Sequence, residues 1–99
     1  MKQAVEKPNK AEPVTGRDHH FYVCSTPLAI PAGITVDQCL ADSGMYGCTA
    51  RDMLEHAVSN SIHASIDERV VWSAIHLLEL SEALRAAAHI EWAKAHDVA

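Results

Sequence analysis

Aromatic residues are scarce in this sequence of 99 residues, at 5%, and acidic residues outnumber basic ones by 13 to 8. With so few aromatics, any core has to be aliphatic and rich in alanine, which suits closely packed helices. From position 19 onward the chain holds four basic and ten acidic residues, a balance of −6. Binding to a nucleic-acid backbone needs clustered Lys and Arg. The composition therefore argues against direct DNA or RNA binding and favours a partner with a basic surface.

Other absences narrow the class of protein. Cys24, Cys39 and Cys48 include no CxxC pair, and their odd number argues against a disulfide framework and for reduced thiols. The sequence has no glycine-rich phosphate loop. Residues 1–20 lack the apolar core of a signal peptide, and no apolar run is long enough to span a bilayer. We expect a soluble, cytoplasmic protein that binds no membrane and no cofactor.

Two similar tetrapeptides indicate where long helices begin. Thr35-Val36-Asp37-Gln38 and Ser65-Ile66-Asp67-Glu68 each place a hydroxyl three residues before Gln or Glu, as in a capping box. After each of them, apolar or small residues recur in alternating steps of three and four. The connection that starts at Ser59-Asn60-Ser61 is short, so the helices should be antiparallel neighbours of about 24 and 30 residues. The sequence predicts an all-α fold built on a helical hairpin.

The predicted contact seam of the first helix runs through small residues. Ser43, Gly47 and Ala50 allow a neighbouring backbone to approach closely, whereas Gly44 and Gly47 each cost about 1 kcal/mol relative to Ala. Two alternatives stay open for this helix. Either it is continuous, or it is kinked or split near Gly44-Gly47, with Thr49 capping a second segment.

The N-terminal part is predicted to be less regular. Residues 1–18 are rich in Lys, Glu, Pro and Asn and should form a flexible tail, which leaves residues 19–99 as a single helical domain. The segment 21–24 has strand-like residues, but Pro27, Pro31 and Gly33 follow it and should prevent regular structure. We expect an extended segment that crosses the helices and inserts Phe21, Val23, Leu28 and Ile30.

Each predicted helix also carries a second apolar stripe beside its seam. Two helices can bury only one stripe apiece, so the surplus has to be covered by the segment 21–34, by a second copy or by another protein. A homodimer that forms a four-helix bundle is the simplest closure. Trp92, near the end of the second helix, adds an aromatic anchor. The predicted partner or dimer interface consists of Cys39, Tyr46, Met53, Leu80, Ile90 and Trp92.

Residues suited to metal binding or catalysis are present but poorly arranged. His76 and Glu79 lie one helical turn apart, and His19-His20 with Cys24 could supply further ligands. A structural zinc site usually has a pair of closely spaced ligands at each end, and the three cysteines of the sequence form no such pair. A cysteine at a helical packing position usually acts as a small hydrophobic core residue. We therefore predict no catalytic, cofactor-binding or metal-binding residue and a protein that is not an enzyme.

The stretch from Phe21 to Leu84 resembles a family of short bacterial proteins, frequent in pseudomonads, that is known only as a domain of unknown function. The resemblance implies a compact helical fold without an assigned activity or catalytic residue. It covers about two-thirds of the chain. The residues that carry it are mostly packing residues, namely Phe21, Val23, Gly33-Ile34, Asp37, Leu40, Ser43, Trp72, Ala74, Leu78, Glu79 and Ala83-Leu84.

These observations favour a small, acidic, non-catalytic module that binds and regulates or inhibits another macromolecule and also self-associates. One alternative is a phage or mobile-element inhibitor of a bacterial defence complex, acting like an anti-CRISPR protein by occupying a basic groove meant for nucleic acid. A second is a metal- or redox-responsive enzyme or sensor that uses His76, Glu79 and the cysteines. In the first two cases a negative face should attract the partner. Its predicted members are Asp67, Glu68, Glu79, Glu82 and Glu91.

Overall fold

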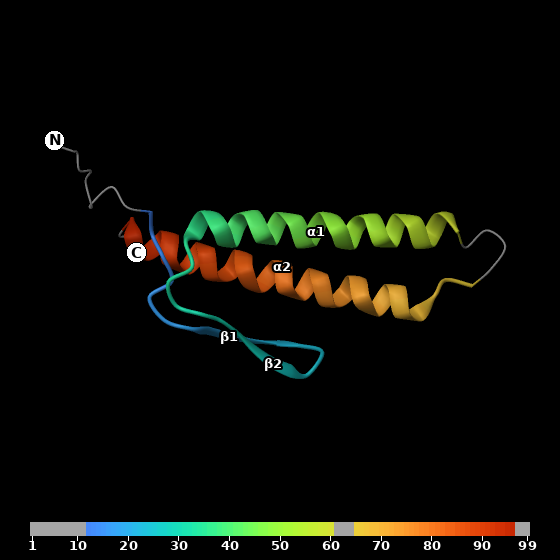
Figure 1. Ribbon diagram of the computed structural model, residues 1–99, viewed down its shortest axis with the longest axis horizontal. Coiled ribbons are helices and arrows are strands. Elements are labelled where there is room, and N and C mark those ends of the chain that lie inside the picture. The colour runs from blue at the N-terminus through green and yellow to red at the C-terminus, as the bar shows by residue number, and fades with distance from the viewer. Residues whose placement is uncertain (1–11, 61–64, 97–99) are drawn as a thin grey trace.

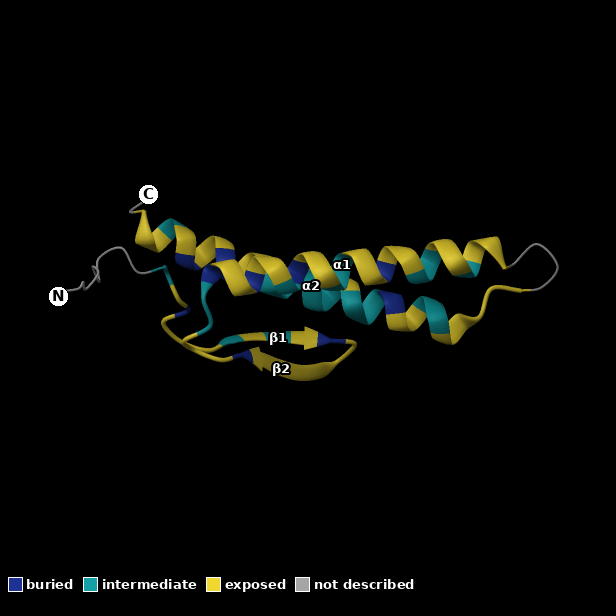
Figure 2. Cartoon of the chain, turned by 45° about the horizontal axis from the view of Figure 1, so that its top comes forward, coloured by how far each residue is buried: buried dark blue, intermediate teal, exposed yellow. Residues whose placement is uncertain are grey.

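Two long antiparallel helices form the body of the molecule. The computed structural model describes residues 12–60 and 65–96. Helix α1 spans Val36–Ser59 and α2 spans Glu68–Ala95, and they pack side by side along their length (Figure 1). Figure 2 shows that the buried and half-buried residues lie where the helices meet each other and the segment before them. The predicted helical hairpin is confirmed.

A two-stranded antiparallel hairpin precedes the helices and lies against one side of them (Figure 1). Strand β1 spans His19–Val23 and β2 spans Thr26–Ile30. The expectation of an all-α fold with an irregular N-terminal segment is therefore wrong, although the chain is mostly helical. Within the described ranges, no helix combines the length and the apolar character that a membrane crossing requires.

The β-hairpin forms in spite of Pro27, which was expected to prevent it. Its two-residue turn uses Cys24 and Ser25, whose φ angles of 47° and 74° suit the tight turns that join twisted strands. Pro27 pairs with Tyr22, one step beyond the pair that closes the turn. Hydrogen-bonded and non-hydrogen-bonded pairs alternate along an antiparallel ladder. The pair that closes a two-residue turn is hydrogen-bonded, so the next pair, that of Pro27, is not. The nitrogen of Pro27 therefore points away from β1. An edge strand tolerates proline at such a position.

The two helices begin at different kinds of cap. Thr35 caps α1 as predicted, because its hydroxyl accepts the N–H of Gln38 at 3.0 Å. Ser65 was expected to cap the second helix, but the cap is Asp67, whose carboxylate accepts the N–H of Arg69 at 2.9 Å. A carboxylate at this position also favours the positive end of the helix dipole and lies 3.3 Å from the Arg69 guanidinium. The helix therefore starts later than predicted.

Helix α1 is continuous, so the split near Gly44-Gly47 does not occur. Thr49 caps no new segment, and its hydroxyl donates to the carbonyl of Met45 at 2.9 Å within the same helix. At mid-seam, the hydroxyl of Ser43 donates to the carbonyl of Ser81 at 2.7 Å, and Ser81 returns the same bond to Ser43. This reciprocal pair holds the two backbones close together, which explains the small residues predicted along the seam.

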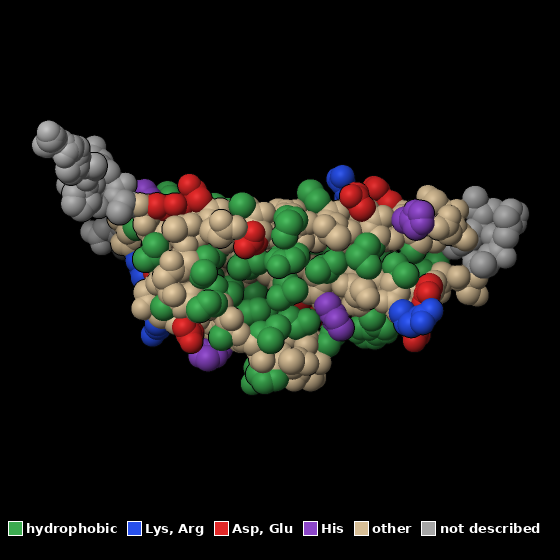
Figure 3. Space-filling model, in the orientation of Figure 1, with side chains coloured by type: hydrophobic (Ala, Val, Ile, Leu, Met, Phe, Trp, Pro, Cys, Tyr) green, Lys and Arg blue, Asp and Glu red, His purple; other side chains and the backbone are tan. Residues whose placement is uncertain are grey.

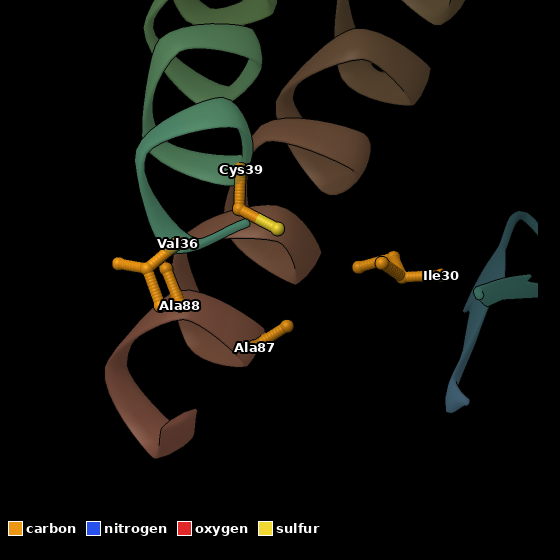
Figure 4. Packing of buried hydrophobic residues seen from close by; sticks show 5 residues of the cluster. All are labelled: Ile30, Val36, Cys39, Ala87 and Ala88. Carbon is orange, nitrogen blue, oxygen red and sulfur yellow. The ribbon is translucent and has the colours of Figure 1, made fainter. Parts of the chain in front are cut away.

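One end of the helix pair carries the apolar core, where the hairpin joins it. Ile30 of β2 points toward Cys39 of α1 and Ala87 of α2, and Val36 packs against Ala88 (Figure 4). All five are buried, and Cys39 is completely so. Because these side chains are small, the elements have to approach closely to exclude water, as the composition predicts.

Residues 12–18 belong to the folded unit rather than to a tail. Thr15 is 2% exposed, and its backbone exchanges hydrogen bonds of 2.9 Å with Gly33 and Ile34. Its hydroxyl donates to the carbonyl of Pro31 at 2.9 Å and accepts the N–H of Ile34 at 3.1 Å. The predicted flexible tail thus reaches no further than residue 11, and residues 1–11 lie outside the described part of the chain.

Thr15→Val keeps the shape of the side chain and removes both hydroxyl hydrogen bonds. The N–H of Ile34 then loses its partner in a half-buried site, so we expect a loss of about 1–3 kcal/mol in the free energy of unfolding, measured with urea. Thr49→Val removes an exposed hydroxyl from α1 and should change the same quantity by less than about 0.5 kcal/mol. Equal effects of the two substitutions would contradict the role assigned to Thr15.

Gly44 and Gly47 should respond oppositely to alanine. A Cβ at Gly44 meets nothing within 4 Å, so Gly44→Ala should stabilise the protein by about 0.5–1 kcal/mol through helix propensity. A Cβ at Gly47 comes within 3.3 Å of the Ser81 hydroxyl, which is fixed by its bond to Ser43. Gly47→Ala should therefore gain nothing or lose stability. Urea denaturation at several protein concentrations measures the stability of both variants. An equal gain in stability for the two would rule out the close contact between Gly47 and Ser81.

Candidate functional site

The residues predicted to form one interface lie in three different environments. Cys39 is completely buried beneath the hairpin and is not available to a partner, which corrects its assignment to the interface. Tyr46, Met53 and Leu80 are half-buried. Ile90 and Trp92 remain exposed. The N-terminal hairpin covers part of the second apolar stripe, and the rest stays open to solvent.

A pocket of about 280 Å³ opens between the hairpin and the helices. Figure 3 shows hydrophobic side chains gathered in the middle of this side of the molecule, with an acidic group beside them and most other charged groups toward the edges. Tyr46 and Leu80, two of the predicted interface residues, lie at this pocket. The residues that line it are Phe21, Leu28, Ala29, Ile30, Pro31, Ile34, Asp42, Tyr46, Leu80 and Leu84.

A groove lies on the other side of the seam. Successive residues are about 100° apart around a helix, so Gly44 points roughly opposite to Asp42 and Tyr46, which face the pocket. The middle of the groove has a volume of about 420 Å³ and is lined by Ser43, Gly44, Gly47, Cys48, Arg51, Leu78, Ser81, Glu82 and Arg85. Toward the end of α2 it adjoins a hollow of about 200 Å³ lined by Val36, Leu40, Arg85, Ala88, His89 and Trp92.

The five acidic residues do not share one face. Asp67 and Glu68 stand exposed at the start of α2, and Glu82 is exposed at the groove. Glu79 accepts the backbone N–H of Cys24 at 3.1 Å and so holds the turn of the hairpin against α2. Glu91 is only 5% exposed, which corrects its assignment to the outer face. It lies against β1, where its carboxylate contacts His19.

Glu91 is the buried centre of a polar cluster. Its Oε2 atom is 2.8 Å from Nε2 of His19 in β1 and 3.5 Å from Nζ of Lys94. Burial alone raises the pKa of Glu91. The hydrogen bond with His19, the charge of Lys94 and the N–H of Gly16 outweigh it, so the pKa lies below its ordinary value. The carboxylate is therefore ionised at neutral pH and ties the N-terminal segment to α2.

Two of the cysteines are poorly suited to nucleophilic chemistry. Desolvation, followed by the charge and the hydrogen bond of Glu79, raises the pKa of Cys24. Burial, followed by the charge of Asp42, raises the pKa of Cys39. A raised pKa lowers the thiolate fraction, and the thiolate is the reactive form. All three cysteines are free thiols.

The possible metal ligands are dispersed. His19 is occupied by Glu91, and Glu79 by Cys24 of the hairpin turn. Across the two described ranges, no three His, Cys, Asp or Glu side chains come together where they could hold a metal ion. His63 lies outside the described residues. The alternative of a metal- or redox-responsive site thus receives no geometric support from the described residues.

Several residues that shape these surfaces were not predicted from the sequence. Asp42 at the pocket and Arg51 and Arg85 at the groove read as ordinary charged positions on helices, because their spacing carries no motif. His19 was noticed only as a possible ligand, whereas it pairs with a carboxylate 72 positions away. No local signal could have found that pair.

Comparison with protein-family models, with curated proteins and with solved structures finds no match. The resemblance of Phe21 to Leu84 to a bacterial domain of unknown function therefore stays a prediction, and the function has to be argued from the surfaces themselves.

The paired state of Glu91 predicts how stability depends on pH. Because its pKa is lowered by folding, its contribution is fully present above the pKa of the unfolded chain and is lost as the pH falls through the lower folded value. Glu91→Gln should cost about 1.5–3 kcal/mol at neutral pH, as expected for hydrogen bonds to a charged group. The variant should also lose less stability on acidification than the wild type.

Thermal unfolding from neutral into acidic pH measures both effects. Asp52→Asn is the control, since Asp52 is an exposed carboxylate of α1 that lines neither the pocket nor the groove. It should behave as the wild type does at every pH. Parallel pH profiles for the wild type and Glu91→Gln would exclude the assigned role of the cluster.

Proposed function

We propose that this protein acts by binding, as a small non-catalytic interaction module that self-associates through the helix face opposite its β-hairpin. The observation that carries this proposal is the apolar rim of the groove. Leu40, Leu78 and Trp92 are 47%, 39% and 44% exposed although all three belong to the central helix pair. Exposed apolar side chains that are grouped around a concave surface are typical of interaction sites.

The shape of the molecule supports a second copy as the occupant. The hairpin covers one side of the helix pair, and no described element covers the other side. Two helical hairpins that meet through such faces form a four-helix bundle, in which every helix has neighbours on two sides. The small residues Gly47 and Ser81 line the groove and leave room for side chains of the second copy.

The charges beside the groove are compatible with self-association. Arg51 and Arg85 line it together with Glu82, so both signs are present although the chain as a whole is acidic. In a two-fold symmetric dimer, the same patch meets itself. A patch with both signs allows an arginine of one copy to face a glutamate of the other, whereas a purely acidic patch would repel its twin.

Native mass tests the proposal. Sedimentation equilibrium or light scattering at micromolar concentration should give twice the 10.8 kDa of one chain. Leu78→Glu places a charge in the apolar rim of the groove and should shift the mass to that of one chain, because burying an unpaired carboxylate is costly.

Met45→Glu is the control, since Met45 is an exposed apolar residue of α1 that lines neither the groove nor the hollow beside it. This variant should keep the mass of the wild type, and circular dichroism should show the same helix content for all three proteins. A wild type that is monomeric at micromolar concentration would overturn self-association.

A further inference from the structure

The pocket under β2 is a cavity that the described side chains do not fill. Leu28 pairs with Phe21, so the two side chains lie on the same face of the hairpin, toward the helices. Phe21 is packed against the core, yet Leu28 is 40% exposed. Strand β1 rests on α2, whereas β2 overhangs the pocket beside α1. The inward face of β2 is thus covered at Ile30 and left open at Leu28.

The chemistry of the pocket selects for an apolar group next to a positive charge. Leu28, Leu80 and Leu84 provide apolar walls. Asp42 is the one charged side chain among the described lining residues, and its carboxylate accepts a hydrogen bond from the Gln38 side chain at 2.8 Å. Among the residues that the structure describes, no basic side chain lies within ion-pair distance of Asp42.

The size of the pocket and its position point to an extended segment of a protein as the occupant. A volume of about 280 Å³ is just below the 300–1,000 Å³ common for small-molecule sites and suits one large side chain. The pocket also borders the free edge of β2. Ala29 pairs with His20 at a non-hydrogen-bonded position of the ladder, so its N–H and C=O point to that edge. Backbone groups at a free edge can pair with an added strand.

We propose that this pocket receives a large apolar side chain from an extended segment of a partner protein, and that a Lys or Arg beside that side chain pairs with Asp42. This inference deepens the proposed function, since it names the chemistry of a partner for a protein that acts by binding. The excess of acidic residues from position 19 onward attracts such a segment from a distance.

Four short blocked peptides test the proposal directly. Acetyl-Lys-Phe-Lys-amide carries the anchor and the charge, acetyl-Ser-Phe-Ser-amide lacks the charge, acetyl-Glu-Phe-Glu-amide reverses it, and acetyl-Lys-Ala-Lys-amide lacks the anchor. Titrations into the ¹⁵N-labelled full chain should shift the amides of Leu28, Ala29 and Tyr46. We expect the Lys-Phe-Lys peptide to bind most tightly and both the Glu-Phe-Glu and the Lys-Ala-Lys peptides to bind at least about fivefold more weakly.

A matched pair of variants isolates the charge of Asp42. Asp42→Asn keeps an oxygen that can accept from Gln38, and it should weaken binding of the Lys-Phe-Lys peptide about two- to fivefold, as for a partly exposed ion pair. Asp52→Asn removes the same charge from an exposed position of α1 outside the pocket and should leave the affinity unchanged. Neither substitution should change binding of the Ser-Phe-Ser peptide.

Three results would overturn the inference: no shifts at millimolar peptide, equal affinities for the cationic and anionic peptides, or equal effects of Asp42→Asn and Asp52→Asn. The mass measurement on the groove is independent of these titrations. A dimer that ignores the peptides would overturn the pocket and leave self-association standing. A monomer that binds the cationic peptide would overturn self-association and leave the pocket proposal standing.

Discussion

The fold depends on how closely α1 and α2 approach each other. Ser43 and Ser81 exchange hydrogen bonds of 2.7 Å between one helix and the carbonyl of the other, and Gly47 lies against the same contact. Such bonds satisfy the hydroxyls inside the seam, where an unpaired polar group would be costly. With Ala50 and Ala74 buried beyond them, the seam is made of small side chains. A close seam buries little volume, so most of the larger apolar side chains are placed at its two flanks.

The two flanks of the helix pair are covered to different extents. On one flank the N-terminal residues form a hairpin that inserts Ile30 above Cys39, and buried polar contacts fix the hairpin in place. Thr15 links the segment before the hairpin to the segment after it, and His19 contacts Glu91. Buried ionic and hydroxyl groups of this kind specify one arrangement, because any shift leaves them without partners. The opposite flank has no such cover among the described residues, and its groove keeps an apolar rim.

This asymmetry is the basis of both functional proposals. A surface that is apolar, concave and bordered by charges of both signs suits a second copy of the same chain, whereas a small pocket with one carboxylate suits a single basic and apolar segment. The acidic residues contribute less to a common face than their number suggests, because Glu79 is bonded to the turn of the hairpin and Glu91 is buried. In the second proposal, attraction to a basic segment would come from the overall charge and from Asp42 rather than from a continuous acidic face.

The sequence by itself determined the helical hairpin, the cap at Thr35 and the seam through Ser43 and Ala50, because capping and helical periodicity depend on residues three or four positions apart. Only the tertiary structure decided which polar residues face inward. Glu91 follows the helical pattern of an exposed residue, but its nearest partner is 72 positions away. Pro27 reads as a strand breaker, and only the register of the hairpin places its nitrogen at a free edge. The pocket at Asp42 likewise exists because the β-hairpin and both helices meet there, and no stretch of sequence encodes that meeting locally.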